Sequence, residues 1–386
     1  MALQRRLIFY INFIKDLNFV PVILAPFLMS YGFNLSELML VLASFRLTQM
    51  TLSVPMGFLS DYYGPVFTLR LSSICVFLSI LCLTPTHLAL YNFLMFNILS
   101  AISVTLLGAS SSKLLKGIEP HGEKFLKNLS WTLSLRRLGI MISGLIASGL
   151  LLFLPYGPIV WFQVSLSLVL IFISFKVDYT LNIKPNPIRI LNHLKQCLAQ
   201  APYLQIVSTA VVSATFFITF DIFMQPLMIQ AQIPKPLFPF ILAFANCTIF
   251  ISLNLYRVTK KYIHFNYYSS TLIPLIPLVV YIFSGSAYGA LVFMVVTVLM
   301  RPVAVQETVK LVNDNPSANQ GINDALVNTF STGMTAFFSL LLGYCLRYYS
   351  LQLSTLIVLC LLVTFCGVFF AFKNNYEQQV THNLSK

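Results

Sequence analysis

The stretch Leu351–Phe372 reads LQLSTLIVLCLLVTFCGVFFAF and contains no charged residue. A helix of that length rises about 30 Å, which matches the hydrocarbon thickness of a bilayer. Two more uncharged runs cover Leu71–Thr84 and Leu88–Ser112. Over the whole chain 58% of residues are hydrophobic and 9% are charged, whereas soluble domains carry roughly a quarter charged residues. The sequence therefore predicts a protein that crosses a membrane many times.

Further apolar segments, each about 20 residues long, are distributed along the chain. They predict an all-α membrane protein with twelve transmembrane helices, arranged as two pseudo-symmetric bundles of six. We place the N-terminal bundle at 1–176, a linker at 177–202, the C-terminal bundle at 203–373 and a tail at 374–386. The predicted spans lie near 7–30, 36–59, 66–84, 88–110, 134–154, 157–176, 203–229, 237–257, 265–284, 287–309, 325–346 and 351–372.

Basic residues are concentrated in alternate loops, which fixes the expected orientation. If the N-terminus is cytoplasmic, only Lys235 and Arg347 lie in external segments. Positive charge is retained on the cytoplasmic side of membrane proteins, so we expect both termini and the linker to be cytoplasmic and the protein to reside in a bacterial inner membrane. The net charge of +13 then has a topological cause and predicts no nucleic-acid partner.

The two predicted halves also resemble each other. Ala25-Pro26-Phe-Leu-Met aligns without gaps with Gln225-Pro226-Leu-Met-Ile at a spacing of 200 residues, and Ala43 falls on Ala243. A repeat at half length is typical of duplicated transporters.

A polar turn between the second and third spans reads Gly57-Phe-Leu-Ser-Asp61-Tyr-Tyr-Gly64-Pro-Val-Phe-Thr-Leu-Arg70. It resembles the G-x-L-x-D-x-x-G loop motif of the major facilitator superfamily, although the basic residues that usually follow the second glycine are missing. The resemblance implies the fold of that family and transport of a solute by alternating access. Within the motif we expect Gly57 to allow close helix approach, Asp61 to accept hydrogen bonds and Gly64 to permit a tight turn.

The segment Gly108 to Gly139, which joins the fourth span to the fifth and includes the start of the fifth, carries several charges, among them Arg136 and Arg137. It resembles the amphipathic linker of bacterial members of the family, and we interpret these charges as a solvated face. Gly139, Ser143 and Ala147 follow at four-residue spacing, which predicts close helix packing. The Gly-Pro motif typical of proton-coupled drug exporters is absent from this span.

Ionisable side chains inside the predicted spans are the candidate functional residues, because a charge in hydrocarbon needs a partner, water or a function. Asp16 and Asn12 share one face of the first span. Arg46 lies at a similar depth in the second span, so we predict an Asp16–Arg46 ion pair. Lys15 is expected to extend toward the lipid headgroups.

The second half offers Asp221 and Gln225 in the seventh span and Arg301 in the tenth. Pro226 is expected to interrupt its helix, as in many substrate-binding spans. Two interpretations of these charges stay open, namely internal pairs that hold helices together, and groups that bind substrate or protons.

Scattered histidines and cysteines predict no metal site, and the absence of phosphate-binding or nucleophilic motifs predicts neither an enzyme nor a cofactor. The leading hypothesis is a monomeric, proton-coupled secondary transporter for a small organic solute. Export of a drug-like compound or a secreted metabolite such as a siderophore is slightly favoured over uptake of a nutrient. A carrier-like sensor or assembly partner that moves no solute is the remaining alternative.

Overall fold

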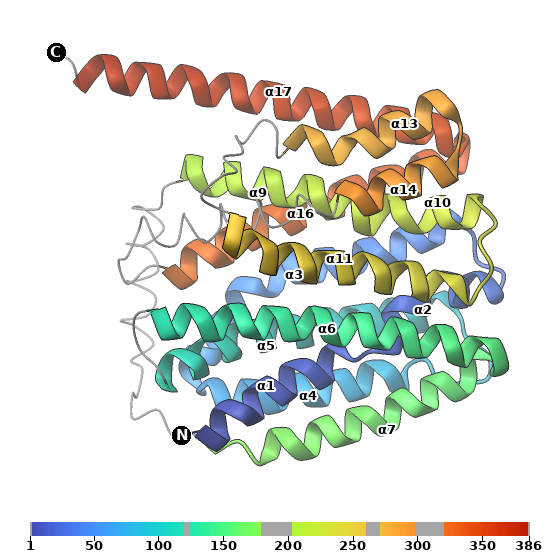
Figure 1. Cartoon of the computed structure of the whole chain (residues 1–386), viewed down its shortest axis with the longest axis vertical. Coiled ribbons are helices and arrows are strands. Elements are labelled where there is room, and N and C mark those ends of the chain that lie inside the picture. Colours follow the sequence, from blue (N-terminus) through green and yellow to red (C-terminus); the bar gives the residue numbers. More distant parts are fainter. Residues whose placement is uncertain (1, 119–122, 179–202, 260–270, 298–319, 385–386) are drawn as a thin grey trace.

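The computed structural model describes residues 2–118, 123–178, 203–259, 271–297 and 320–384. Every regular element in these ranges is helical. Most helices run along one common direction, with both termini at the same end of the molecule (Figure 1). We call this the terminal end and the opposite one the far end.

The first half contains the first six membrane-crossing segments. They are formed by α1 (Ala2–Asp16) with α2 (Phe19–Ser30), α3 (Leu35–Tyr62), α4 (Pro65–Leu81), α5 (Leu90–Ile118), α6 (Glu123–Phe153) and α7 (Tyr156–Phe175).

The second half contains the other six. They are formed by α9 (Tyr203–Phe217) with η1 (Ile218–Phe223) and α10 (Met224–Gln230), α11 (Leu237–Thr259), η2 (Ile273–Leu275) with α13 (Ile276–Ser284), α14 (Ala287–Thr297), α16 (Gln320–Tyr348) and α17 (Leu351–Leu384).

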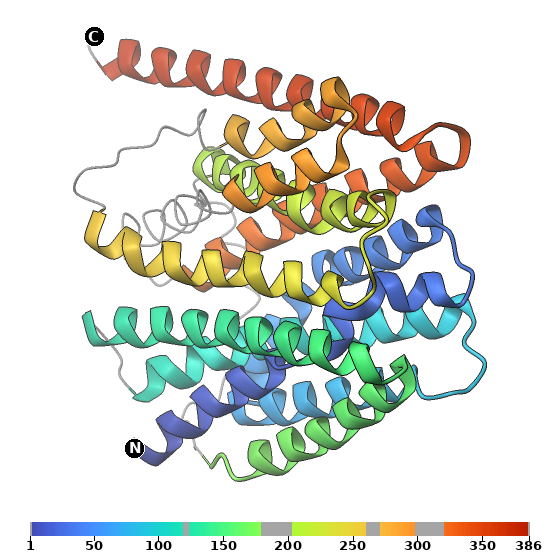
Figure 2. The same cartoon turned by 45° about the vertical axis from the view of Figure 1, so that its right-hand side comes forward.

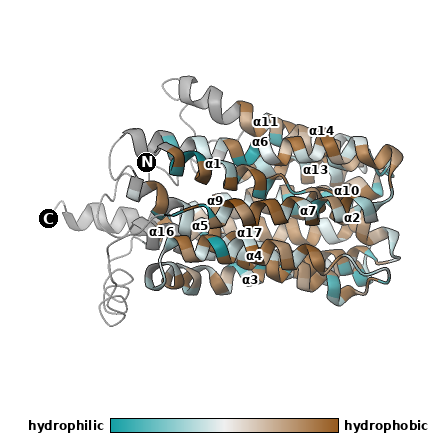
Figure 3. Ribbon diagram, turned by 90° about the horizontal axis from the view of Figure 1, so that it is seen from below, coloured by the Kyte–Doolittle hydropathy of each residue, from teal (hydrophilic) through white to brown (hydrophobic). Residues whose placement is uncertain are grey.

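The prediction of twelve transmembrane helices is confirmed. Eight segments of the described chain are long and apolar enough to cross a membrane, and four shorter apolar helices occupy the remaining predicted spans. Apolar residues predominate along the helices (Figure 3). The first half forms one bundle and the second half lies beside it as another (Figure 2). The protein is therefore a multi-pass membrane protein. Most of the predicted linker, at 179–202, lies outside the described residues.

The first span is broken, which the sequence interpretation did not foresee. α1 ends at Asp16, and α2 begins at Phe19 after the cap residue Asn18, whose Oδ1 accepts from Val20 N at 3.1 Å. The cause is Pro21, because its ring has no N–H for the carbonyl of Leu17 and would collide with it. Phe19 N donates instead to Gln163 Oε1 of α7 at 2.9 Å, so the break leaves no unpaired amide there.

The seventh span is distorted where an interruption was predicted. The chain stays helical from Tyr203 to Gln230 but widens into the π-helical segment η1, Ile218–Phe223. Pro226 accounts for this, because its clash with the carbonyl of Ile222 is relieved when the preceding turn opens. The irregularities of the first and seventh spans thus fall at nearly equivalent positions of the two halves.

Two helix pairs join the halves most extensively, α3 with α16 and α6 with α11. Both pairs are tightly packed near the far end. Ser36 Oγ donates to the carbonyl of Gly343 at 2.6 Å, and a Cβ on Gly144 would lie 2.6 Å from the carbonyl oxygen of Pro239. Contacts this close indicate that the protein is closed at the far end.

The loop motif is only partly as expected. Gly64 has φ +87° and precedes α4, so the tight turn is confirmed. Nothing lies within 4 Å of a Cβ built on Gly57, so its predicted role in close helix approach is wrong; its carbonyl accepts from Lys113 Nζ at 3.2 Å. Arg70 Nη2 donates to the carbonyl of Val177 at 3.0 Å, just beyond α7. The side chain of Asp61 lies outside the described residues.

Candidate functional site

The centre of the candidate site is an ion pair between the halves. Arg46, midway along the Leu35–Ser60 span of α3, contacts Asp221 of η1 through Nη2 and Oδ2. The Asp221 side chain is 44% exposed although its helix lies against the other half, and the Arg46 side chain is 15% exposed. Of the two groups, the carboxylate is therefore the more accessible.

Arg46 is held in place by several groups besides Asp221. Its Nη1 donates to Gln49 Oε1 at 3.0 Å, and its guanidinium carbon lies 4.8 Å from the ring centroid of Phe217 on α9. Planar guanidinium groups stack well on aromatic faces. One turn after Gln49, Ser53 Oγ accepts from Asn328 Nδ2 of α16 at 3.1 Å. Arg46, Gln49 and Ser53 therefore share one face of α3, and contacts from this face reach the second half.

Asp16 pairs with a different arginine from the one predicted. Its Oδ2 lies 2.5 Å from Arg136 Nε of α6, so the predicted Asp16–Arg46 pair is wrong. The reason is the packing of the helices, because α1 packs against α5, α6 and α7 while α3 packs against α16. Asp16 is only 13% exposed, and its partner belongs to the same half.

Arg136 and Arg137 were interpreted as part of a solvated face, and this is wrong. Both lie in the Ser134–Phe153 span. Arg137 Nη1 donates to Asn246 Oδ1 of α11 at 3.1 Å, which makes a second polar contact between the halves. The sequence feature that could have placed both arginines inside the span is Gly139. A Cβ there would lie 2.8 Å from the carbonyl oxygen of Phe13, so the helix must enter the bundle before Gly139.

Lys15 does not extend to the headgroups. It is 6% exposed, and its Nζ is buried without a hydrogen-bond partner. It falls on the buried stripe of α1 that also contains Ile8, Ile11 and Asn12. An ammonium group in this position is within electrostatic range of Asp16 and Arg136. The site therefore holds a buried amine that has no hydrogen-bond partner among the described residues.

The remaining predicted residues are distributed as follows. Asn12 is 2% exposed and donates to Ser111 Oγ of α5 at 3.2 Å, so it meets a different helix from Asp16. Gln225, one turn after Asp221, has a buried Oε1 that accepts no hydrogen bond. Arg301 lies outside the described residues. Their roles in binding remain proposals.

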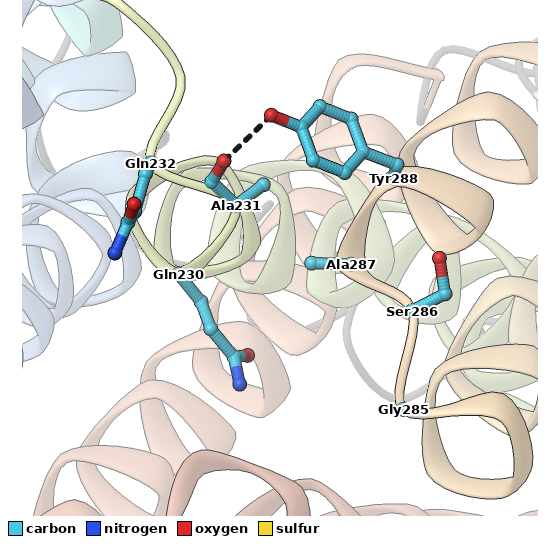
Figure 4. Close-up of a pocket in the computed structure, with 7 residues that line it drawn as sticks. All are labelled: Gln230, Ala231, Gln232, Gly285, Ser286, Ala287 and Tyr288. Atoms are coloured by element: carbon cyan, nitrogen blue, oxygen red, sulfur yellow. Dashed lines mark hydrogen bonds between the residues drawn. The ribbon is translucent and has the colours of Figure 1, made fainter.

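A pocket of about 470 Å³ lies elsewhere, at the far end of the second half. Figure 4 shows its lining, with Tyr288 Oη donating to the carbonyl of Ala231 at 2.8 Å. No charged residue lines it. The lining residues are Gln230, Ala231, Gln232, Gly285, Ser286, Ala287 and Tyr288. Since Gln230 and Asp221 are separated by more than two helical turns, this pocket is separate from the charged site.

No protein-family model matches the sequence, and no curated protein sequence matches it. The fold, by contrast, is shared with solved transporters. A D-xylose–proton symporter superposes with a TM-score of 0.70 at 11% identity, over 95% of each chain. A POT family transporter in complex with a thioalcohol-conjugated peptide gives 0.74 at 10% identity, over 96% of each chain.

A bacterial homologue of the human lysosomal transporter Spinster, in an inward-facing and unoccupied conformation, gives a TM-score of 0.65 at 13% identity. That match covers 96% of this chain and 95% of the other. Coverage of this extent means that both halves and their arrangement agree. The chain thus has the major facilitator fold that its loop motif and twelve spans predict.

Proposed function

We propose that the protein is a proton-coupled secondary transporter that moves a small organic solute by alternating access. The observation that carries this proposal is the ion pair between Arg46 and Asp221, which joins the two halves inside the membrane-spanning region. In alternating access the halves rock about a site near the midplane. A contact between the halves within the membrane-spanning region is made and broken during such a cycle.

Proton coupling follows from the chemistry of this contact. Protonation of Asp221 removes the negative charge that Arg46 contacts, so the neutral acid no longer favours the paired arrangement. A proton that binds one conformation better than the other shifts the population between them. The 44% exposure of the carboxylate gives it access to water in this state.

Asp16 is the weaker candidate for the coupling group. Its partner Arg136 belongs to the same half, so the pair stays intact when the halves move as rigid bodies. We therefore assign proton coupling to Asp221 and a structural role to Asp16. The D-xylose–proton symporter of the same fold supports a proton as the coupling ion.

The test starts from the solute, which is identified by comparing metabolites of medium and cells with and without the gene. Flux of that solute is then measured in proteoliposomes with an imposed pH gradient. The wild type should accumulate solute against its gradient. Asp221→Asn should lose this accumulation and keep solute exchange. Accumulation by the wild type that survives collapse of the pH gradient would contradict proton coupling, and absence of any flux would contradict transport.

The same metabolite comparison decides direction. We propose residence in the inner membrane with both termini cytoplasmic, and export as the direction. A solute enriched in the medium of cells that carry the gene supports export. Enrichment inside the cells supports the uptake alternative.

A further inference from the structure

We infer that the transported solute carries an anionic group, a carboxylate or a phosphate, that binds at Arg137 between the two halves. This inference rests on the proposed transport function and adds the chemical class of the solute. It starts from the charges that the described helices bring together, which do not balance.

Four cations and two carboxylates make up the charged cluster. The carboxylates of Asp16 and Asp221 are each occupied by one arginine, Arg136 and Arg46 respectively. The two cations without a carboxylate contact among the described residues are Arg137 and Lys15. Within the described part of the chain the cluster therefore has one positive charge in excess, from Arg137, and a second when Lys15 is protonated.

Arg137 occupies the central position among these groups. It lies within electrostatic range of both ion pairs, that is, of Arg136, Asp16, Asp221 and Arg46. Its hydrogen-bond acceptor among the described residues is a neutral amide oxygen, Asn246 Oδ1 at 3.1 Å on the other half. A guanidinium group has five N–H donors in a planar fork, so most of its donors remain available to a ligand.

Lys15 provides an independent observation. Its amino group is buried, has no hydrogen-bond partner, and lies in electrostatic range of Asp16, which is already paired with Arg136, and of Arg136 itself. An isolated buried cation is strongly unfavourable unless a counter-ion balances it. A fold that keeps such a group next to Arg136 is stabilised further when an anion enters.

The same charges discriminate against other solutes. A cationic solute would add to the excess positive charge, and a neutral solute would leave it uncompensated in a region of low dielectric. Carboxylates and phosphates match the arginine fork in charge and geometry. Gln225 adds a buried polar group one turn from Asp221 whose Oε1 has no partner, which suits a further polar atom of the solute.

Binding is tested on the full-length protein purified in detergent, by thermal unfolding with matched pairs of probes at millimolar concentration and equal ionic strength. The pairs are benzoate with benzamide, succinate with succinamide, and glycerol phosphate with glycerol. The anionic member of at least one pair should raise the unfolding midpoint more than its neutral partner. Arg137→Gln should abolish that difference. Arg347→Gln, which removes an exposed arginine at the far end of α16, should retain it.

Arg137→Lys keeps the charge without the fork, and should bind the same anion more weakly than the wild type. It replaces Arg137→Gln in the comparison if the latter fails to fold. The inference is overturned if no anionic probe stabilises the wild type, if neutral partners stabilise it equally, or if Arg137 variants bind as well as the wild type.

The two proposals fail separately. If an anion binds through Arg137 but shows no flux in proteoliposomes, the anionic site stands and transport is contradicted. If a pH gradient drives flux of a neutral solute and no anion binds, transport stands and the anionic site is contradicted.

Discussion

Arg46 of α3 and Asp221 of η1 form an ion pair between the two halves of the fold, at a point where the seventh span is π-helical. π-helical turns occur frequently at functional sites because they displace side chains from the regular helical pattern. Here the turn contains the half-exposed carboxylate, and Pro226 lies three residues after the end of η1. The pair therefore combines a contact between the halves with a locally irregular backbone.

Exchanging the two charges tests this contact. Arg46→Asp and Asp221→Arg should each lower flux strongly, since each places two like charges together. The double exchange should restore part of the flux. Because Asp221 is half-exposed, the coupling free energy in a cycle of thermal unfolding should be about 0.5–1 kcal/mol. Strictly additive effects in both flux and stability would show that the contact has no role.

The packing of Gly139 against the break in the first span predicts a stability effect. A Cβ at Gly139 would lie 2.8 Å from the carbonyl oxygen of Phe13 and 3.1 Å from the carbonyl carbon of Asp16. Gly139→Ala should therefore destabilise the protein by about 1–3 kcal/mol, measured by thermal unfolding in detergent. Gly149→Ala is the matched control on the same helix, because nothing lies within 4 Å of its Cβ. An unchanged midpoint in Gly139→Ala would contradict the close packing.

Gly144 predicts a change of conformation. A Cβ there would lie 2.6 Å from the carbonyl oxygen of Pro239 and 2.8 Å from the Cβ of Ala243, both on the other half. Gly144→Ala should oppose closure of the far end by about 1.4 kcal/mol, which is roughly a tenfold change in population. A thiol introduced as Ser36→Cys should then react faster with a membrane-impermeant maleimide. Gly144→Ala without Ser36→Cys measures the labelling of native cysteines, and equal rates with and without Gly144→Ala would refute the shift.

Much of the fold could be predicted from the sequence because hydropathy is a local property. Each of the twelve apolar segments can be recognised from its own residues alone. The small residues that follow Gly139 at four-residue spacing likewise indicate close packing from local sequence. The break before Phe19 was also predictable, since Pro21 cannot bond to the carbonyl of Leu17.

The partners of the charged residues could not be predicted in this way. Depth in the membrane follows from position along a span, so it can be estimated for Asp16 and Arg46 from the sequence. The choice of partner depends on which helices pack together and on their rotation, which no single span encodes. Arg136 and Arg137 were misplaced for a related reason. Charged residues at the edge of an apolar segment resemble a loop, and only the packing of Gly139 against α1 shows that the helix lies inside the bundle at this point.

Lys15 predicts opposite effects on stability and function. Its buried ammonium group has no hydrogen-bond partner, and methionine has a similar length without the charge. Lys15→Met should raise the midpoint of thermal unfolding. The free energy of unfolding should increase by about 1 kcal/mol or more, since replacement of a buried charge by an apolar side chain is often stabilising. Flux of the physiological solute should fall, because the site loses one positive charge near Arg136. Arg347→Met, at an exposed position of the far end, should change neither quantity. A lower midpoint for Lys15→Met would mean that Lys15 stabilises the fold through a contact of its own.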